Sequence, residues 1–434
     1  MTESALLMSA ALVICLGLGI WVGLALLLSA SLVLFFYSSV PLGALLSQYS
    51  LNILTTPDLV ALPLFIIMGE FLVRTRLSQM LFSGLAPWAD LLPGRLLHVN
   101  VIACTIFASI SGSSAATTQV VGRMSLTELL RRGYRRDIAL GSLAGAGTLG
   151  FLIPPSTIMI IYGVLAQESV LRLFAAGVLP GLMIATLYGG YIMLRAVLDP
   201  SIAPSDDEAY SGMRLVDRFR ASRQLAPVFA LIFFTLGSMY FGIATPSEAA
   251  AIGVIGAAGI AWLDGSLTRE VLRAVATGSA RTCAMIGLIM VGATVLSITS
   301  TILGYPARIN GWVATLDLSP VALIAVMLAV YLLLGCFMDG FSMIVTTLPI
   351  FLPLAVSAGF DPLWFGIFII IAVEMSQITP PVGFNLFVIN GLTGDRIGHI
   401  ARVTLPFLLL MVIAVFLLVQ FPGIATWLPT RLIG

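Results

Sequence analysis

Charged residues are scarce in this sequence, and that scarcity limits the kind of protein it encodes. Only 9% of the 434 residues are Asp, Glu, Lys or Arg, whereas 59% are hydrophobic. A soluble domain carries about 25% charged residues. Apolar runs of about 17 residues or more recur along the chain, and each is long enough to cross the hydrocarbon core of a bilayer. The composition excludes a soluble globular protein and predicts an all-α polytopic protein embedded in a lipid bilayer.

Lysine is absent, and cysteine and histidine are rare. All 21 basic residues are arginine, and no basic cluster interleaves with aromatic residues, so nucleic-acid binding has no support. The cysteines lack metal-ligand spacing, no nucleophile–base pair stands out, and no phosphate-binding Gly-Lys-Ser/Thr loop occurs. We therefore expect neither an enzyme nor a resident cofactor. The cysteines and histidines are Cys15, Cys104, Cys283, Cys336, His98 and His399.

The apolar segments fall into two groups separated by one polar stretch. We predict a first repeat over residues 1–198, a cytoplasmic linker over 199–225 and a second repeat over 226–434. Polar residues such as Asp206 and Glu208 are typical of a connecting segment. The predicted apolar segments lie near residues 5–19, 21–39, 58–76, 94–131, 138–163, 172–198, 226–242, 247–263, 274–304, 320–357, 362–389 and 403–420.

The fourth segment of each half is too long for one span. Residues 94–131 are interrupted by Ser111-Gly112-Ser113-Ser114, and residues 320–357 by Asp339-Gly340-Phe341-Ser342. A chain that enters the membrane, turns at polar residues and returns is a re-entrant hairpin, which is tolerated only where protein or a wet cavity covers it. We predict one such hairpin in each half.

The two halves align without a gap at a single constant offset. This repeat offset takes Gly133-Tyr134 to Gly359-Phe360, Pro154-Pro155 to Pro380-Pro381, and Ser113 to Asp339. A proline pair, a glycine–aromatic turn and a polar hairpin tip that recur in one register indicate an internal repeat.

Arginine distribution predicts that the two repeats are inverted. The turn after the first hairpin, residues 131–136, holds four arginines, whereas its counterpart at residues 358–362 holds none. Because cytoplasmic loops are enriched in arginine and lysine, the first turn is predicted inside and the second outside. Both chain termini then fall on the periplasmic side. Inverted repeats are a common architecture of secondary transporters, with the site between the repeats.

The two proline pairs predict broken helices near residues 138–163 and 362–389. Proline lacks an N–H group and clashes with the preceding turn, so two in succession open a helix. The freed carbonyls and neighbouring hydroxyl groups suit a small cation such as Na⁺, and the freed N–H groups at the start of the next half-helix suit a carboxylate. We expect each break to form a transport site with a hairpin, although a proline kink can also be structural.

The predicted binding residues lie at the two hairpin tips and the two breaks. Small hydroxyl residues also promote helix packing in membranes, which is the alternative reading for each serine. The candidate Na⁺ ligands are Ser113, Ser114, Asp339 and Thr379. The full set of candidate substrate- or cation-binding residues is Ser111, Gly112, Ser113, Ser114, Thr117, Gly150, Pro154, Pro155, Ser156, Asp339, Gly340, Ser342, Glu374, Gln377, Thr379, Pro380, Pro381, Gly383 and Asn385.

Asp339 and Glu374 lie inside the predicted apolar segments that hold the second hairpin tip and the second break. An intramembrane acid is by default a functional hypothesis, although Asp339 is also placed to cap the returning helix of its hairpin. Glu374 precedes the second break, where it would ligate a cation, carry a proton, orient the loop or form a structural hydrogen bond. Because both acids can be protonated, H⁺ remains an alternative to Na⁺ as coupling ion. Thr245 and Glu248, by contrast, have the spacing of a structural capping box.

These residues together resemble the large membrane subunit, the M or DctM-like permease, of tripartite ATP-independent periplasmic (TRAP) transporters. The resemblance covers essentially the whole chain. Its matching stretches are Ile110-Ser111-Gly112-Ser113-Ser114-Ala115-Ala116-Thr117, Arg132-Gly133-Tyr134, Leu149-Gly150, Ile153-Pro154-Pro155-Ser156, Tyr162-Gly163, Leu173-Phe174-Ala175-Ala176-Gly177, Pro180-Gly181, Phe337-Met338-Asp339, Gly359-Phe360-Asp361-Pro362 and Ile378-Thr379-Pro380-Pro381-Val382-Gly383.

The resemblance implies uptake of a small organic acid across the bacterial inner membrane. It implies an elevator mechanism driven by a Na⁺ gradient, with a periplasmic substrate-binding protein and a separate small four-helix membrane subunit as partners. Cation sites would lie between residues 111–114 and 150–156, and between residues 339–342 and 377–385. Many members of this family have glycine where Ser376 stands and an apolar residue at the position of Gln377, a departure that favours a dicarboxylate-type substrate over sialic acid.

Other functions remain as alternatives. A stand-alone Na⁺/dicarboxylate symporter of related fold would transport without partner proteins. An intramembrane hydrolase would need an acid pair, a serine–lysine pair or a histidine–metal group within the spans, and the sequence offers none. A passive channel would conduct without a coupled ion.

Overall fold

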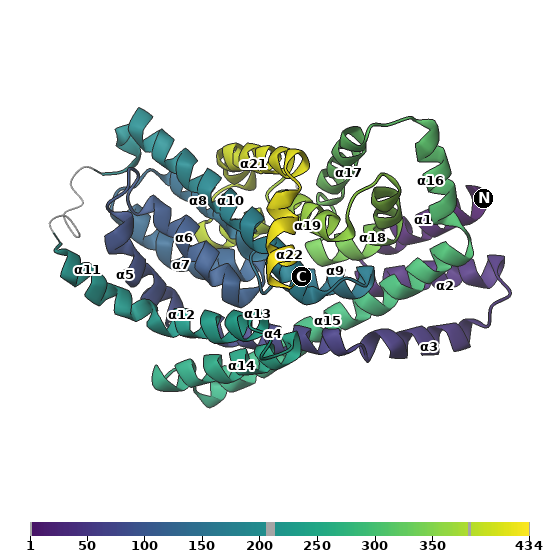
Figure 1. Ribbon diagram of the computed structural model, residues 1–434, viewed down its shortest axis with the longest axis horizontal. Coiled ribbons are helices and arrows are strands. Elements are labelled where there is room, and N and C mark those ends of the chain that lie inside the picture. Colours follow the sequence, from purple (N-terminus) through teal and green to yellow (C-terminus); the bar gives the residue numbers. More distant parts are fainter. Residues whose placement is uncertain (1, 205–212, 381–382, 434) are drawn as a thin grey trace.

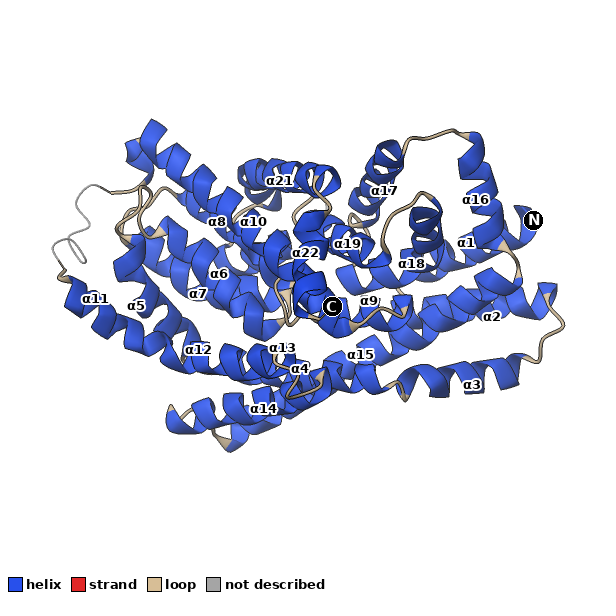
Figure 2. Cartoon of the chain, in the orientation of Figure 1, coloured by secondary structure: helices blue, strands red, loops and turns tan. Residues whose placement is uncertain are grey.

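The computed structural model describes residues 2–204, 213–380 and 383–433, and within these ranges it contains helices and connecting loops but no strand (Figure 2). Figure 1 shows the helices in sequence colours, with the C-terminus near the centre of the view and the N-terminus at one end. The helices of residues 1–198 are α1 (Thr2–Gly17), α2 (Val22–Tyr37), α3 (Leu42–Leu54), η1 (Pro57–Val60), α4 (Ala61–Val73), α5 (Leu77–Ala89), α6 (Leu97–Ser111), α7 (Ser114–Arg131), α8 (Arg136–Gly147), η2 (Thr148–Gly150), α9 (Thr157–Ala166) and α10 (Val170–Leu198).

The rest of the chain adds a similar series. Its helices are η3 (Pro200–Ile202), α11 (Leu215–Ser222), η4 (Arg223–Leu225), α12 (Ala226–Ile232), η5 (Phe233–Gly237), α13 (Ser238–Tyr240), α14 (Pro246–Leu263), α15 (Arg269–Ile302), α16 (Tyr305–Thr315), α17 (Pro320–Leu334), α18 (Gly340–Ser357), α19 (Pro362–Gln377), α20 (Phe384–Thr393), α21 (Ile397–Gln420) and α22 (Gly423–Leu432).

The repeat offset found in the sequence reappears in the helix starts. The offset takes Ser114, where α7 begins, to Gly340, where α18 begins. It likewise takes Arg136, the first residue of α8, to Pro362, the first residue of α19. The helices that follow the two hairpin tips and the two glycine–aromatic turns therefore begin at equivalent positions.

Helices long and apolar enough to cross a membrane recur along the described chain. Six meet this test by length and composition: α10, the continuous helical segment 215–240, α14, α15, α18 and α21. A seventh is possible if α3 and the segment Pro57–Val73, which meet at an angle of 59°, form one bent span. Since α18 alone has the length of a span, the re-entrant course of residues 320–357 stays a prediction.

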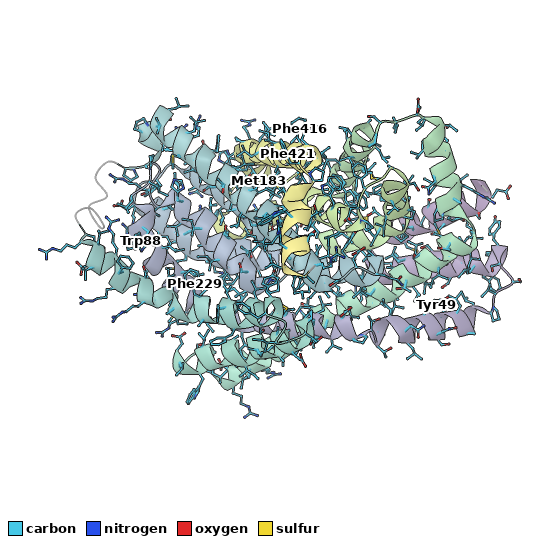
Figure 3. All side chains as sticks on the ribbon, viewed as in Figure 1. Tyr49, Trp88, Met183, Phe229, Phe416 and Phe421 are labelled. Atoms are coloured by element: carbon cyan, nitrogen blue, oxygen red, sulfur yellow. The ribbon has the colours of Figure 1, made fainter. Side chains whose placement is uncertain are left out.

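The molecule exposes apolar side chains as a protein in lipid does. Phe229 of α12 is 50% exposed and Phe416 of α21 is 58% exposed, and both project from the ribbon in Figure 3. Water would penalise such a surface, whereas hydrocarbon does not. This surface agrees with the expectation of a bilayer around the chain.

Close packing between α2 and α15 depends on glycine. A Cβ atom on Gly292 would lie 2.4 Å from the carbonyl oxygen of Gly23, and one on Gly23 would lie 2.7 Å from the backbone of Leu288. Small residues let two helix backbones approach closely in a membrane, where van der Waals contact replaces the hydrophobic effect as the main attraction. The glycines therefore fix how these two long helices cross.

Helix α19 is the most enclosed element of the fold. Every residue from Leu363 to Gln377 is buried, and the helix contacts α9, α10, α17, α18, α21 and α22. Trp364 anchors its first turn, since the indole N–H donates to the carbonyl oxygen of Leu418 at 3.1 Å and the ring stacks between Phe360 and Phe368. A polar side chain on α19 therefore has only protein around it.

The predicted linker of residues 199–225 is not wholly a loop. Helix α11 begins at Leu215, well before the predicted start of the second repeat, and continues as helical structure to Tyr240. Arg218 is buried and donates to the carbonyl oxygens of Pro87 and Met213. Trp88 donates to Ser222 at 2.7 Å. Contacts with α5 hold this polar, amphipathic helix in place. A search for apolar runs does not detect a helix of this kind.

Several short helices also lie outside the predicted apolar segments. They are α3, α5, α16 and α22, each of 10–13 residues. A helix this short gives a weak hydropathy signal, because it does not fill the length of a membrane crossing. The predicted capping box is confirmed: Thr245 accepts from the backbone N–H of Glu248, whose side chain accepts from the backbone N–H of Thr245 at 2.8 Å.

Candidate functional site

The first hairpin turns where the sequence predicts. Helix α6 ends at Ser111, Gly112 adopts a left-handed conformation with φ of +57°, and α7 begins at Ser114. Ser113 caps α7 by accepting from the N–H of Ala116 at 3.4 Å. Thr117 donates to the carbonyl oxygen of Ser113 at 2.8 Å, and the hydroxyl groups of Thr117 and Ser111 lie 2.9 Å apart. The predicted hydroxyl residues are thus gathered at the tip, where they also hold the turn.

The first helix break lies directly against this tip. Both the backbone N–H and the hydroxyl group of Thr157 donate to the carbonyl oxygen of Gly112, at 3.3 and 2.8 Å. A Cβ atom on Gly112 would lie 2.8 Å from the carbonyl oxygen of Pro155, and one on Gly150 would lie 2.4 Å from the Cα atom of Ser114. The two glycines are needed for this contact. Ser156 caps α9 by accepting from the N–H of Met159 at 3.4 Å.

We call the contact of residues 111–114 with residues 148–157 the first junction. It brings together the predicted site residues of the first half, including Pro154, Pro155 and Ser156, all of which are buried. Helix α4 also reaches it, because a Cβ atom on Gly69 would lie 3.2 Å from the carbonyl oxygen of Ser111.

Glu374 belongs to the first junction, although it lies on the second broken helix. The side chain is fully buried. Its Oε1 atom accepts from the hydroxyl group of Ser114 and, at 2.7 Å, from the backbone N–H of Phe151. Its Oε2 atom has no hydrogen-bond partner among the described residues. The carboxyl group therefore ties the first hairpin and the first break to α19, a contact that sequence proximity to the second break does not suggest.

The tip of the predicted second hairpin meets the second break by packing. A Cβ atom on Gly335 would lie 2.2 Å from the Cβ atom of Ser376, and the thiol of Cys336 lies 3.5 Å from the carbonyl oxygen of Pro380. Asp339 precedes α18 and accepts from the hydroxyl group of Ser342. We call the contact of residues 335–342 with residues 376–385 the second junction.

Polar groups of the second break are only partly satisfied. Thr379 donates to the carbonyl oxygen of Met375 at 2.8 Å and accepts, through its own carbonyl oxygen, from the N–H of Gly383 at 3.1 Å. Asn385 of α20 is fully buried, and neither its side-chain oxygen nor its nitrogen has a partner among the described residues. Gln377 is also buried. Pro381 lies outside the described residues.

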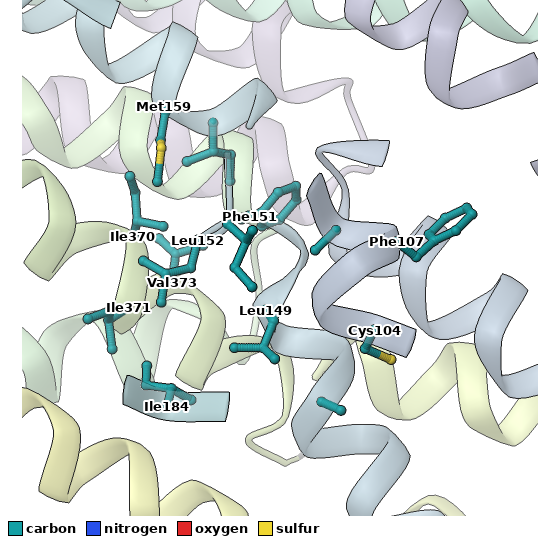
Figure 4. Packing of buried hydrophobic residues seen from close by; sticks show 14 of the residues in the cluster. Cys104, Phe107, Leu149, Phe151, Leu152, Met159, Ile184, Ile370, Ile371 and Val373 are labelled. Atoms are coloured by element: carbon teal, nitrogen blue, oxygen red, sulfur yellow. The ribbon is translucent and has the colours of Figure 1, made fainter. Parts of the chain in front are cut away.

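The two junctions are in contact with each other. A Cβ atom on Gly340, at the start of α18, would lie 2.8 Å from Val373 of α19 and 3.2 Å from Ile158 of α9. The rings of Phe151 and Phe341 lie 5.4 Å apart, edge to face. Figure 4 shows the apolar side chains of the first break beside those of α19, including Val373. Both hairpin tips and both breaks therefore converge on one region.

Several residues in this region escaped the sequence analysis. Thr157 and Phe151 make contacts in the first junction. Gly335 and Cys336 make contacts in the second. Thr157 continues a polar run, Ser156-Thr157, which is a usable signal after a proline pair. Phe151 contributes a backbone N–H group, and no side-chain pattern identifies such a donor.

Charged contacts surround the turn after the first hairpin. Arg136, at the start of α8, donates to the carboxylate of Asp395 in the loop after α20, at 2.8 Å. This hydrogen bond and charge hold the pKa of Asp395 below its ordinary value. Arg135 pairs with Asp199 at 2.7 Å. The predicted turn of four arginines is therefore joined by ion pairs to segments far away in the sequence.

Comparison with known proteins finds relatives among TRAP transporter permeases and a solved transporter of the same fold. The chain is 32% identical to the C4-dicarboxylate TRAP transporter large permease protein of Pseudomonas aeruginosa over 377 residues, 86% of each chain. It is 30% identical to the ectoine/5-hydroxyectoine TRAP transporter large permease protein of Ruegeria pomeroyi, again over 86% of each. The crystal structure of the YdaH transporter of Alcanivorax borkumensis has the same fold, with a TM-score of 0.59 and 14% identity over 89% of this chain and 90% of that one.

The family described as the DctM component of the tripartite ATP-independent periplasmic transporters matches residues 9–424. That match covers nearly the whole chain, and its members are permeases rather than enzymes. The resemblance stated from the hairpin and proline-pair motifs is thereby confirmed. The chain belongs to the DctM family of TRAP transporter large permeases.

Proposed function

We propose that the chain is the membrane permease of a Na⁺-coupled uptake system for a small organic acid in the bacterial inner membrane, and that it moves its substrate by an elevator mechanism. The observation that supports this proposal is that both hairpin tips and both helix breaks converge on one region. There Glu374 of the second broken helix bonds to the first hairpin tip and the first break. Transporters of this general type bind substrate and ion where broken helices meet near the middle of the bilayer.

Carboxylate substrates fit the chemistry of this region and the relatives. Half-helix starts point N–H groups at the breaks, and such starts favour anions. The Pseudomonas relative bears the name of a C4-dicarboxylate system, whereas the Ruegeria relative bears that of an ectoine system. We therefore propose a small carboxylate, with a C4-dicarboxylate such as succinate as the first substrate to test.

Sodium ions are proposed as the coupling cargo, held by oxygen atoms of the two junctions. Ser114 and Thr379 present hydroxyl groups there, and Asp339 presents a carboxylate. Na⁺, like other hard cations, prefers oxygen ligands of this kind. Because Glu374 and Asp339 can be protonated, H⁺ is the alternative coupling ion.

Partners are proposed from the family. TRAP systems are tripartite, so a periplasmic substrate-binding protein and a small four-helix membrane subunit would act with this chain, and both chain ends would be periplasmic. A stand-alone symporter makes the opposite prediction, because it transports when reconstituted alone.

The test is uptake of labelled succinate into proteoliposomes that contain the chain with and without both partners. We expect uptake only with all three components and an inward Na⁺ gradient. Uptake by the chain alone would favour the symporter, and uptake driven by a proton gradient without Na⁺ would favour H⁺ coupling.

The proposed ion ligands are tested in the same assay. We expect Ser113→Ala, Asp339→Ala and Thr379→Ala to raise the Na⁺ concentration needed for half-maximal uptake. Ser109→Ala is the matched control, because that hydroxyl group only returns to the carbonyl oxygen of Thr105 within α6. Unchanged Na⁺ dependence in all three variants would remove the ligand assignment.

A further inference from the structure

A cavity of about 560 Å³, lined by both polar and apolar side chains, lies between the first hairpin and helices α4 and α5. Helix α7 contributes Gln119, Arg123 and Thr127 to its wall, and α5 contributes Gln79 and Ser83. Residues four apart share one face of a helix. One face of α7 is therefore polar along this cavity, whereas the rest of the helix is largely buried in the fold.

This cavity lies along the path from the first junction to the arginine-rich turn. Helix α7 begins at Ser114 in the junction and ends at Arg131. Arg123 is nine residues along the helix from Ser114, which corresponds to about 13 Å at a rise of 1.5 Å per residue. An ion that leaves the junction along this face of α7 therefore passes the guanidinium group of Arg123.

Arg123 is free to meet a passing anion. Its side chain is exposed, and no acid within ion-pair distance of it occurs in the part of the chain that the structure describes. The acid that lines the same cavity is Glu128, and its carboxylate is engaged by Arg131 at 2.7 Å and by Arg132 at 2.6 Å. The cavity therefore carries one positive charge that the described side chains leave unpaired.

The second hairpin shows that this polarity is not required for packing. Helix α18 lines a cavity of about 370 Å³ with Val345, Pro349 and Pro353. The repeat offset takes Gln119, Arg123 and Thr127 to these three positions in turn, so the equivalent face of each returning helix lines a cavity. On α18 the face is apolar, and on α7 it carries the arginine.

We propose that Arg123 is an anion-binding station on the inner side of the transport path, which contacts the carboxylate of the substrate between the first junction and the cytoplasm. The inference rests on the proposed function for its direction and substrate class. A guanidinium group binds a carboxylate through two parallel hydrogen bonds. At an exposed position this contact is weak, as a transport path requires, because an ion must leave each station it enters.

The first arm of the test measures the local electrostatic potential without the substrate. Thr127→Cys places a thiol one turn from Arg123, since Thr127 bonds to the carbonyl oxygen of Arg123. The permease is labelled with two methanethiosulfonates, one bearing a sulfonate and one bearing a trimethylammonium group. We expect Arg123→Gln to lower the anionic-to-cationic rate ratio about three- to tenfold, from Coulomb's law at about 6 Å in water with partial screening by salt.

Matched controls isolate Arg123. Pro353→Cys is the equivalent position on α18, and its rate ratio should not respond to Arg123→Gln. Arg431→Gln removes an exposed arginine of α22 and should leave the ratio at Thr127→Cys unchanged. The protein without an introduced thiol gives the background from its four native cysteines.

The second arm measures succinate uptake by the three-component system in proteoliposomes. We expect Arg123→Gln to slow uptake about tenfold with unchanged Na⁺ dependence, and Arg123→Lys to restore part of the rate because it keeps the charge. A rate ratio at Thr127→Cys that ignores Arg123, an unreactive thiol there, or wild-type uptake in Arg123→Gln would each overturn the inference. Absence of uptake by the wild-type system would instead count against the proposed function, and the labelling arm would still decide whether Arg123 attracts anions.

Discussion

The first and second junctions share a sequence pattern but differ in how they are closed. In the first, hydrogen bonds join the hairpin tip to the break at Thr157 and to α19 through Glu374. In the second, the hairpin packs through Gly335, the thiol of Cys336 makes a long contact with Pro380, and Asn385 is buried without a partner among the described residues. Among the described residues, the first junction thus leaves one buried polar atom without a partner, Oε2 of Glu374, whereas the second leaves both polar atoms of the Asn385 amide without one.

This difference shows that positions related by the repeat offset share helix starts but not the chemistry around them. A buried polar group without a partner costs about 1–3 kcal/mol, so a protein keeps one where a ligand or water supplies the missing bond. We infer that bound substrate or ion contributes more to the second junction than to the first. The predictions below test that contrast.

The largest effect is expected when Glu374 is replaced by alanine. Glu374→Ala leaves the hydroxyl group of Ser114 and the N–H of Phe151 without an acceptor in a buried site, at a cost of about 1–3 kcal/mol each. We expect a lower melting temperature of the purified protein and loss of more than about tenfold in uptake, as for other broken buried networks. The measurements are thermal unfolding in detergent and succinate uptake.

Glu374→Gln separates structure from charge. The amide keeps the shape and one acceptor oxygen, so we expect most of the thermal stability to return. If uptake returns as well, the negative charge is not needed and Glu374 is a structural contact. A melting temperature of Glu374→Ala equal to that of the wild type would contradict the described closure of the first junction.

The next effect compares a glycine from each junction. Gly150→Ala would place a methyl group 2.4 Å from the backbone of Ser114, whereas Gly335→Ala would meet the side chain of Ser376 at 2.2 Å. We expect overpacking in both variants to lower the free energy of unfolding by about 1–3 kcal/mol. The melting temperature and the uptake rate should fall with it. Ser376→Gly should rescue Gly335→Ala, because it removes the side chain that the new methyl group meets. No substitution at position 114 should rescue Gly150→Ala, because there the methyl group meets backbone atoms. Gly190→Ala on α10 is the control, since no atom lies within 4 Å of its added methyl group.

Rescue of Gly150→Ala by Ser114→Gly, or failure of Ser376→Gly to rescue Gly335→Ala, would show that these contacts are not the ones that set the two junctions. Thermal unfolding of the single and double variants decides this without any transport assay.

A smaller effect of mixed sign is expected at Asn385. Asn385→Leu removes a buried amide that has no partner among the described residues. We therefore expect the free energy of unfolding to stay equal or to rise by up to about 1–3 kcal/mol, and the melting temperature to follow it. Uptake should fall, because the amide would then be missing for the substrate or ion. A fall in stability together with unchanged uptake would mean that Asn385 has a structural partner and that the second junction is as complete as the first.

Much of this arrangement follows from sequence patterns that report local physics. Proline pairs open a helix wherever they occur, Gly112 permits a left-handed turn, and Thr245 with Glu248 caps a helix with contacts only three residues apart. The positions of the hairpin tips and breaks were predictable for this reason. The same holds for the repeat offset, which depends only on the recurrence of these signals.

Contacts between distant segments were not predictable in this way. Glu374 is four residues before Ile378 of the second break, but its helix passes the first junction, and only the packing of α19 decides which one its carboxylate reaches. Helix α11 is polar and packs against α5, which lies far away in the sequence. The sequence places Asn385 among the candidate binding residues, but only the packing of α20 shows that its buried amide has no partner among the described residues.

The smallest effect concerns the first residue of each broken helix, Arg136 of α8 and Pro362 of α19. Arg136 pairs with Asp395 after the first hairpin, whereas the equivalent of Arg136 in the second half is Pro362, which has no charge. The hydrogen bond from Arg136 lowers the pKa of Asp395 in the folded protein. Its contribution is therefore fully present above the unfolded pKa of about 3.9 and is lost as the pH falls through the lowered folded value.

Replacement of Asp395 by asparagine measures this contribution. We expect Asp395→Asn to cost about 0.2–1 kcal/mol at pH 7, as partly exposed ion pairs do, and less in 1 M salt. The difference in melting temperature between wild type and Asp395→Asn should shrink as the pH is lowered from about 7 toward about 3.5, where the carboxyl group begins to take up a proton. Asp317→Asn, which removes an acid without an ion pair in the described residues, is the control for loss of a carboxylate. A difference that is constant with pH would mean that the loop after α20 is held by its backbone contacts rather than by this charge.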